Sequence, residues 1–493
     1  MKRQVTIAKE AGFSFGGLVV GQGLRFLFNL AVASLLGAEY LGVFALSLAV
    51  MQIVEIVAVS GLDMGVLRYV NLSEGFAEKQ RGYIASALKT SLLYSLPVTL
   101  FLVVFSGFLA DLLNGDNLLR LALVCYSLSL PFSVLLAVAG HSIQAYRKLR
   151  PKIMAVQVIF PVLVLLFLLL VNALVGGTAA LLFSPPAAGF VTFIWIWNRL
   201  KAITGVSAKD VLRAGHERAI LKYARPMMFA AFLSMVSHWL DILMLGWYTD
   251  AETVGLYQPA IRTAGLMRSV LIAFSGIAAP IFAGMHGRGE IKELQKMFRV
   301  LSRWVMMVAI PFAVYLLIMP AAVLELFGKE FTVATPVLTV LAAALLVQSV
   351  FGLYDTMLQM TGYSRVCLIN GAAGLALHVL LNMLFISHYG MIGAAWALLA
   401  LYLLLGAART AELKALLGIH AFSRTLLKPL TAGLLSAGAL AAVKPFLDDQ
   451  HVAVSLVGGM LFVFALYLLL IRLMKLEQEE LGVILELFSF VKK

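Results

Sequence analysis

The chain has 493 residues, of which 62% are hydrophobic and 13% are charged, whereas soluble proteins average about 45–50% apolar and about 25% charged residues. This composition excludes a set of water-soluble domains, and it excludes disordered and collagen-like chains, which are poor in apolar residues or strictly periodic. A polytopic membrane protein remains, so the meaning of the net charge of +13 depends on where the basic residues lie.

The predicted elements are membrane-spanning helices. The basic start of the chain is followed by an apolar stretch to Leu36 that is too long for a cleaved signal, which predicts a retained first helix. Apolar segments of about 20 residues, enough to cross about 30 Å of hydrocarbon, recur along the whole chain. The fourteen predicted spans are 12–36, 41–66, 84–110, 118–140, 153–173, 176–198, 223–247, 254–284, 300–319, 335–360, 366–387, 391–408, 429–446 and 453–471.

Basic residues predict the orientation of these spans, because Lys and Arg in short loops favour the cytosolic side. Alternate connections carry most of the 38 Lys and Arg, whereas the connections on the other side carry Arg120, Lys329 and Lys444. Both termini are therefore expected in the cytosol. The net positive charge is mainly a signal of topology, and we expect no nucleic-acid partner.

An internal repeat relates the two halves of the chain. Three short matches keep nearly the same offset of 213 to 216 residues: Leu41–Phe44 with Val254–Tyr257, Gln144 with Gln359, and Gly177–Ala180 with Gly393–Trp396. The predicted fold class is an all-α polytopic membrane protein with two six-helix lobes, related by a pseudo-two-fold axis along the membrane normal, plus two extra C-terminal helices.

The predicted domain organisation follows from the repeat. Residues 1–200 form the first lobe, 201–222 a cytosolic linker, 223–410 the second lobe, 411–473 the two extra helices, and 474–493 a cytosolic amphipathic tail.

Charges deep in the predicted spans are the candidate functional residues, because each costs at least about 2.5–3.5 kcal/mol in the bilayer centre unless it faces a cavity or a partner. They are Arg25, Glu55, Asp241, Arg262 and Arg268. Two interpretations stay open. Glu55 and Arg268 occupy equivalent repeat positions and would form an interlobe ion pair, while Asp241 would pair with Arg262. Alternatively, the three arginines line a polar cavity and bind an anion such as phosphate, with bidentate guanidinium contacts.

Gating or ion coupling is the expected role of Glu55 and Asp241, and His238 is a candidate proton site beside Asp241. The chain has no Walker A, HExxH or GxSxG pattern and no Cys/His cluster. We therefore expect no enzyme, no cofactor and no metal site. Transport would be driven by Na⁺ or H⁺ coupling, by the membrane potential or by the substrate gradient.

Three segments resemble a known family: Leu36–Phe44, Trp239–Gly246 leading to Val254–Tyr257, and Asn382–Ala395 with its motif Tyr389-Gly-Met-Ile-Gly-Ala-Ala. They resemble the polysaccharide-export (Wzx-like) branch of the multidrug/oligosaccharidyl-lipid/polysaccharide (MOP) exporter superfamily. The resemblance implies a V-shaped, two-lobed flippase with alternating access. Its substrate would be a polyprenyl-diphosphate-linked oligosaccharide or polysaccharide repeat unit, moved from the inner to the outer leaflet of the cytoplasmic membrane.

The same resemblance implies contacts with membrane lipids and with glycan polymerase or export proteins. Related lipid II flippases place arginines of helices 1, 2 and 8 in the central cavity, which implies that role for Arg25 and Arg268; helix 2 here carries Glu55 instead. Alternative functions are a cation-coupled multidrug exporter, a lipid II flippase and a membrane scaffold for a glycan synthase.

Overall fold

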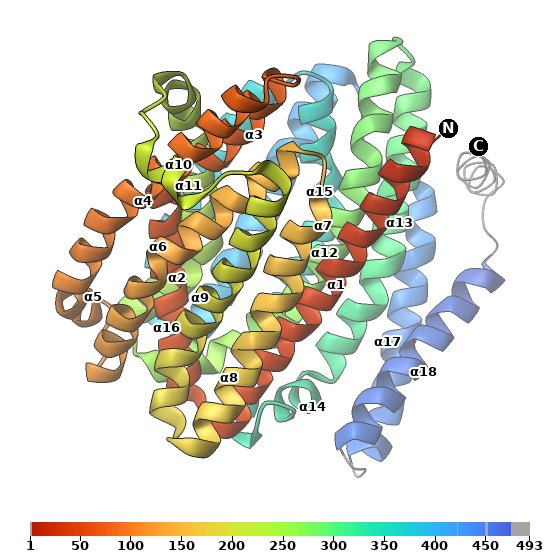
Figure 1. Cartoon of the computed structure of the whole chain (residues 1–493). Helices are drawn as coiled ribbons and strands as arrows, with labels where there is room; N and C mark the ends of the chain where they lie inside the picture. Colours follow the sequence, from red (N-terminus) through yellow and green to blue (C-terminus); the bar gives the residue numbers. More distant parts are fainter. Residues whose placement is uncertain (1, 422, 449–451, 475–493) are drawn as a thin grey trace. The chain divides into compact units, whose positions relative to one another are not determined.

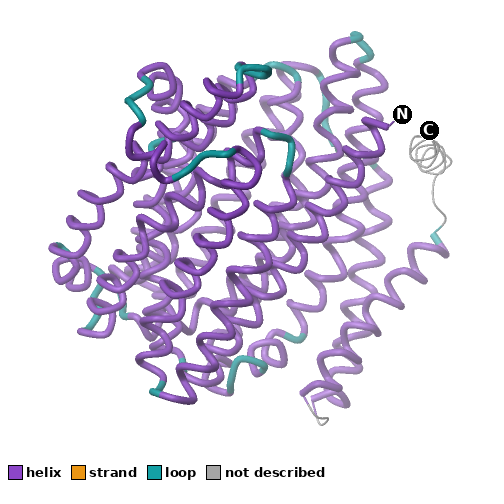
Figure 2. Tube along the Cα trace, in the orientation of Figure 1, coloured by secondary structure: helices purple, strands orange, loops and turns teal. Residues whose placement is uncertain are grey.

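The computed structural model describes residues 2–421, 423–448 and 452–474 (Figure 1). Within these ranges every regular element is a helix (Figure 2), which confirms the predicted all-α class. The predicted amphipathic tail lies, from residue 475 on, outside the described residues.

The chain divides into two compact units, Met1–Gln258 and Pro259–Lys493. The helices of unit 1 are α1 (Lys2–Leu36), α2 (Ala38–Val59), α3 (Leu62–Leu72), α4 (Ala77–Val104), α5 (Ser106–Leu112), α6 (Asn117–Ala145), α7 (Leu149–Ile153), η1 (Met154–Ile159), α8 (Phe160–Leu174), α9 (Gly177–Thr204), α10 (Ala208–Arg213), α11 (Arg218–Tyr248) and the start of α12 (Ala251–Gly287). The boundaries of the lobes and the linker stay a prediction.

Helix α6 is the central helix of unit 1, where it packs against α2, α3, α4 and α9. Aromatic side chains join three of the helices, since the ring of Phe44 lies 4.9 Å from that of Phe28 and 6.5 Å from that of Tyr126. The hydroxyl of buried Tyr126 donates to the Leu181 carbonyl at 2.9 Å, so its polar end is satisfied. Helix α11 packs on α2 and α3 in this unit.

Two spans of unit 1 depart from a regular α-helix. The second predicted span is one segment in sequence but breaks between α2 and α3, where Ser60 and Gly61 have φ values of 52° and 70°. Glycine adopts this left-handed conformation without a steric penalty. The fifth span contains a π-helical turn, η1, between α7 and α8. Such turns leave the α-helical hydrogen-bond pattern and often mark functional sites.

Unit 2 contains the rest of α12 and the remaining helices: α13 (Ile291–Ile318), α14 (Pro320–Glu325), η2 (Lys329–Ala334), α15 (Thr335–Met360), α16 (Ser364–Leu417), η3 (Arg424–Leu426), α17 (Leu427–Asp448) and α18 (Val452–Leu473). Its core includes edge-to-face contacts of Phe298 with Phe282 at 5.9 Å and with Tyr354 at 5.0 Å. Helices α17 and α18, the two predicted extra helices, pack on each other and on α13.

The number of spans agrees with the prediction. Thirteen helices among the described residues are long and apolar enough to cross a membrane. One of them, α16, has 54 residues and a non-helical residue at Gly390, with φ 57° and ψ −134°. This break separates the predicted spans 366–387 and 391–408, so thirteen helices accommodate fourteen passes.

The helix boundaries repeat with the period of the sequence matches. Helices α4 and α13 each have 28 residues and begin 214 positions apart. The short helices that follow them, α5 and α14, keep the same offset of 214. The two halves therefore share helix lengths and order as well as short motifs.

Candidate functional site

The six candidate residues lie on four helices. Arg25 is on α1, Glu55 is on α2, and His238 and Asp241 are on α11, all in unit 1, while Arg262 and Arg268 are on the part of α12 that belongs to unit 2. The pairs Glu55–Arg268 and Asp241–Arg262 each join residues of different units, and these pairings stay predictions.

Arg25 is half-buried and contacts the π-helical turn. Its Nη2 donates to the Val156 carbonyl at 3.2 Å, and the Nδ2 of Asn29 donates to the Arg25 carbonyl at 2.7 Å. Helix α1 approaches η1 closely because Gly21 has no side chain: a Cβ there would lie 2.8 Å from the Gln157 carbonyl oxygen.

The surroundings of Arg25 retain unused polar groups. The buried Oδ1 of Asn29 and Oε1 of Gln157 have no hydrogen-bond partner among the described residues. Buried polar atoms are usually paired, so unsatisfied ones require an explanation. Among the described residues of unit 1, Arg25 has no carboxylate within ion-pair distance. A cation held only by a neutral carbonyl is available to a further acceptor.

Arg268 is held in a similar way. Its Nη2 donates to the Tyr402 hydroxyl of α16 at 3.0 Å, and its buried Nε has no partner. No carboxylate of the described part of unit 2 lies within ion-pair distance of it. Arg262, six residues earlier on the same helix, is half-buried. Arg25 and Arg268 thus share one property: each is fixed by one neutral oxygen.

The three gating or coupling candidates have different surroundings. The Glu55 side chain lies near the Ser133 hydroxyl of α6, which donates to the Leu130 carbonyl at 3.0 Å. Asp241 is 8% exposed, whereas His238 is exposed and its ring lies 5.2 Å from that of Trp239. The Trp239 Nε1 donates at 3.2 Å to Gln52, one turn before Glu55. Helices α2 and α11 are therefore joined by a polar contact beside these residues.

A polar cluster that sequence reasoning missed lies on α3, α6 and α7. The Asp63 carboxylate is 3.7 Å from His141 Nδ1, and Lys152 donates to the Gln144 side chain at 2.7 Å. The repeat pointed to this place, because Gln144 is one of its matched residues. Asp63 and Lys152 lie near the ends of predicted spans, where charged residues usually act as helix caps or as topology signals. Only the folded structure shows that they belong to one cluster.

Unit 2 contains a comparable cluster around Gln359, the repeat partner of Gln144. Gln359 donates to the Asp355 carboxylate at 2.9 Å, and Arg409 forms an ion pair with Asp355 at 3.4 Å. Asn370 donates to Glu412 at 2.6 Å, joining the two halves of α16. The matched glutamines thus both hydrogen-bond charged side chains at the same helix end.

The segment between α9 and α11 is anchored to α4. Lys89 Nζ donates to the carbonyls of Leu212 and Ala214 at 2.9 and 2.8 Å. Helix α10 begins with a capping box in which the Ser207 Oγ accepts from the Asp210 amide at 3.4 Å. The Ser207 hydroxyl and amide in turn donate to the Asp210 carboxylate at 2.7 and 2.8 Å. These two hydrogen bonds lower the pKa of the Asp210 carboxyl below its ordinary value.

Comparisons with known proteins support the family resemblance. The family model described as "Polysaccharide biosynthesis protein" matches residues 31–336. The probable low-salt glycan biosynthesis flippase Agl15 of Haloferax volcanii is 27% identical over 386 residues, which cover 77% of either chain.

Two solved structures share the fold. The lipid II flippase MurJ in an inward closed conformation has a TM-score of 0.74 at 14% identity, over 93% of this chain and 97% of that chain. An inward-facing MATE family multidrug resistance transporter of the MOP superfamily has a TM-score of 0.69 at 16% identity, over 80% of this chain and 94% of that chain. These matches confirm the predicted MOP fold. Because the family model matches more than half of the chain, this multi-pass membrane protein belongs to the polysaccharide biosynthesis protein family.

Proposed function

We propose that the protein is a flippase that moves a polyprenyl-diphosphate-linked oligosaccharide from the inner to the outer leaflet. The observation that carries this proposal is the state of Arg25 and Arg268, two guanidinium groups in membrane spans that are each held by a single neutral oxygen. A cation inside a membrane span without an anionic partner is costly. An anionic substrate that supplies the missing charge explains why both are retained.

The chemistry of arginine suits a diphosphate. Guanidinium stays charged, offers several donors in one plane and binds phosphate oxygens in a bidentate manner. The buried Nε of Arg268 is a donor that a phosphate oxygen would satisfy. The name of Agl15, a probable glycan biosynthesis flippase, supports a glycan on the lipid. The lipid II flippase fold supports a lipid carrier.

The proposed location is the cytoplasmic membrane with both termini in the cytosol. Support comes from the basic residues, which gather in alternate connections. In this orientation the α2–α3 break and the polar clusters lie toward the inner leaflet. Glycan polymerases or export proteins are the proposed partners on the outer side, where the moved glycan would be used.

We assign the coupling of transport to Glu55, Asp241 and His238, through Na⁺, H⁺ or the membrane potential. Support comes from the position of Glu55 and Asp241 on α2 and α11, helices joined by the Trp239–Gln52 hydrogen bond. We expect this contact to be the route by which a change of charge on one helix affects the other. The protein is proposed to work without a cofactor and without catalysing a chemical step.

The test is a flipping assay in proteoliposomes with a fluorescent lipid diphosphate that carries a short oligosaccharide. Arg25→Ala and Arg268→Ala are expected to lower the rate by more than about tenfold, the effect of one charge-assisted hydrogen bond of about 1.5–3 kcal/mol. Arg288→Ala is the control, because Arg288 forms an exposed pair with Glu290 at 2.8 Å. Wild-type rates in both arginine variants would refute the proposal, as would Glu55-dependent export of a cationic dye without lipid flipping.

A further inference from the structure

The Val156 carbonyl that accepts from Arg25 has no donor in the backbone of its own helix. In an α-helix it would accept from the amide of residue 160. That amide, of Phe160, donates instead to the Ala155 carbonyl, five residues back, which is the π-helical pattern. In the same pattern the donor to Val156 would be residue 161, which is a proline and has no N–H. The carbonyl is therefore free for a donor from another helix.

Pro161, at the start of α8, is the cause of this free carbonyl. A proline ring also clashes with the carbonyl four residues back, here that of Gln157, and a local π-helical turn is one way in which membrane helices accommodate such a proline. The backbone of α1 lies directly against this turn, because a Cβ on Gly21 would be 2.8 Å from the Gln157 carbonyl oxygen. The altered turn thus faces α1 one helical turn before Arg25.

The equivalent helix of unit 2 lacks this arrangement. Helices α7 and α16 begin 215 positions apart, at Leu149 and Ser364, and this offset matches Pro161 with Ala376. From Ser364 to Tyr389 the chain is α-helical, without a π-helical turn. A regular helix at the same place of the repeat indicates that the fold does not require a proline there. The residue that uses the free carbonyl, Arg25, is the feature that calls for it in unit 1.

Arg25 obtains a defined orientation from this carbonyl. Its Nη2 donates to Val156 at 3.2 Å, which uses one of the several donors of the guanidinium and leaves the others for phosphate oxygens. We propose that Pro161 is a positioning residue for substrate recognition: it removes one backbone donor, so that Val156 holds Arg25 in the orientation that binds the diphosphate. This inference rests on the proposed flippase function and adds to it a residue that does not touch the substrate.

The first measurement follows the Val156 carbonyl by NMR of the full chain in lipid nanodiscs, without substrate. Labelling with carbonyl-¹³C valine and ¹⁵N glutamine leaves two signals, because a valine precedes a glutamine at Val156–Gln157 and at Val347–Gln348. The second pair lies in α15, and its signal serves as an internal reference for correct folding.

The expected result depends on whether residue 161 can donate. Carbonyl carbons shift downfield when they accept a hydrogen bond, so Arg25→Ala should move the Val156 signal upfield in the chain with Pro161. In Pro161→Ala the restored backbone donor satisfies the carbonyl. Arg25→Ala in that background should therefore leave the Val156 signal in place.

The second measurement is the flipping assay at varied substrate concentration. Pro161→Ala is expected to raise the concentration that gives the half-maximal rate about threefold to tenfold, and to change the maximal rate less. A merely structural defect would lower the amount of active protein and leave this concentration unchanged. Because the proline acts through the arginine, Pro161→Ala combined with Arg25→Ala should be no slower than Arg25→Ala alone.

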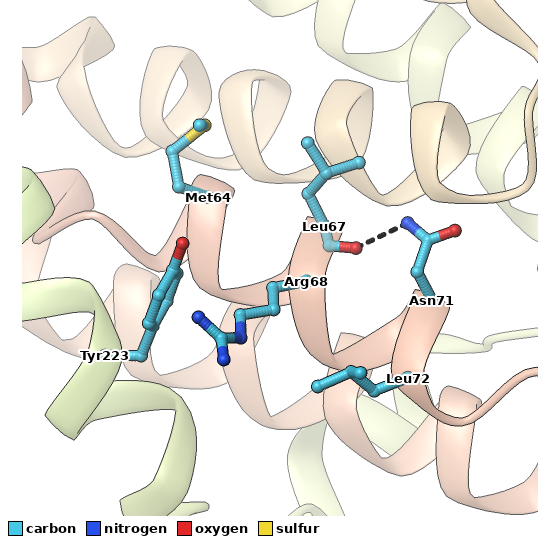
Figure 3. Close-up of a pocket in the computed structure, with 6 residues that line it drawn as sticks. All are labelled: Met64, Leu67, Arg68, Asn71, Leu72 and Tyr223. Carbon is cyan, nitrogen blue, oxygen red and sulfur yellow. Dashed lines mark hydrogen bonds between the residues drawn. The ribbon is translucent and has the colours of Figure 1, made fainter. Parts of the chain in front are cut away.

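Two control variants change the same residue types elsewhere in unit 1. Pro97→Ala removes an exposed proline inside α4. Arg68→Gln removes an exposed arginine that lies 4.3 Å from the centre of the Tyr223 ring and lines a separate depression of about 380 Å³ between α3 and α11 (Figure 3). Neither control should move the Val156 signal or the half-maximal concentration.

The positioning role would be overturned by a Val156 signal that is the same with and without the Arg25 side chain. It would also be overturned if Pro161→Ala keeps the response to Arg25→Ala, or if flipping depends on Arg25 and is unaffected by Pro161→Ala. The expected NMR shifts together with wild-type flipping in Arg25→Ala would refute the proposed function instead, because the NMR measurement contains no substrate.

Discussion

Gly42 of α2 and Gly255 of α12, which occupy equivalent positions of the internal repeat, pack directly against each other. A Cβ on Gly42 would lie 2.9 Å from the Gly255 nitrogen and would clash with the Ala251 carbonyl oxygen. A Cβ on Gly255 would lie 2.9 Å from the Gly42 nitrogen and would clash with the Ala38 carbonyl oxygen. Each helix thus presents a small residue, three intervening positions and a glycine, the pattern that lets helix backbones touch in membranes.

This contact predicts that Gly42→Ala and Gly255→Ala destabilise the protein. The added methyl meets backbone, which cannot rotate away, so we expect a loss typical of overpacking, about 1–3 kcal/mol. The measurement is thermal unfolding of the full chain in detergent, in which Tm should fall. Gly265→Ala is the control, because nothing lies within 4 Å of a Cβ at that position. Equal Tm values in all three variants would contradict the close packing.

Tyr402→Phe tests how Arg268 is positioned. The hydroxyl accepts from the charged guanidinium at 3.0 Å, and losing an acceptor that only positions Arg268 should cost part of the about 1.5–3 kcal/mol of a charge-assisted hydrogen bond. We expect the flipping rate to fall about threefold to tenfold, less than in Arg268→Ala. Tyr40→Phe is a matched control that removes a hydroxyl bonded to Thr178 at 2.9 Å. A Tyr402→Phe variant as slow as Arg268→Ala would mean that the tyrosine itself contacts the substrate.

The Asp355–Arg409 ion pair predicts a measurable coupling in unit 2. The two side chains are 32% and 22% exposed, so breaking the pair should cost less than the about 3–5 kcal/mol seen for fully buried pairs, on the order of 1–2 kcal/mol. A double-mutant cycle with Asp355→Asn and Arg409→Gln, followed by chemical denaturation, measures it. The exposed pair Arg147–Glu74, 62% and 70% exposed, should give about 0–1 kcal/mol. Equal coupling energies in the two cycles would argue against a special role for the cluster around Gln359.

Lys89→Met should release the segment after α10. The lysine satisfies the carbonyls of Leu212 and Ala214, and without it these groups must turn to water. We expect faster amide hydrogen exchange across residues 208–217, with no change in α6. Lys79→Met serves as the control, because Lys79 lies over the Tyr83 ring at 6.0 Å and makes no contact with this segment. Unchanged exchange in Lys89→Met would show that the segment is anchored sufficiently by Ser86, which accepts from the Glu217 amide, and by the Thr90–His216 hydrogen bond.

The capping box of α10 predicts a pH dependence with a defined sign. The pKa of Asp210 is lowered by the hydrogen bonds from Ser207, so the charged carboxylate favours the folded helix start. This stabilisation is complete above the ordinary aspartate pKa of about 3.9 and is lost as the pH falls through the lower folded value. Carboxyl ¹³C NMR of the full chain should show the Asp210 midpoint moving upward in Ser207→Ala. If the Asp210 midpoint in Ser207→Ala equals that of the wild type, a group other than the Ser207 hydroxyl lowers the pKa of Asp210.

Much of the fold follows from local properties of the sequence. The fourteen spans, their order and the repeat were predictable, because hydrophobic length and short motifs are read along the chain. The break at Gly390 agrees with two predicted spans inside α16. The break between α2 and α3 was not predicted, since the segment around Ser60 and Gly61 is as apolar as a continuous helix.

The candidate site was predictable only in part. The sequence by itself determined which charges lie in membrane spans, because a charged residue in an apolar run is visible without any structure. Only the tertiary structure decided their partners: Val156 for Arg25 and Tyr402 for Arg268 lie 131 and 134 residues away along the chain. The π-helical turn beside Arg25 and the contact of Gly42 with Gly255 were likewise visible only in the tertiary structure. Hydrophobic patterning specifies where a helix runs, whereas a side chain's partner depends on which distant helix packs beside it.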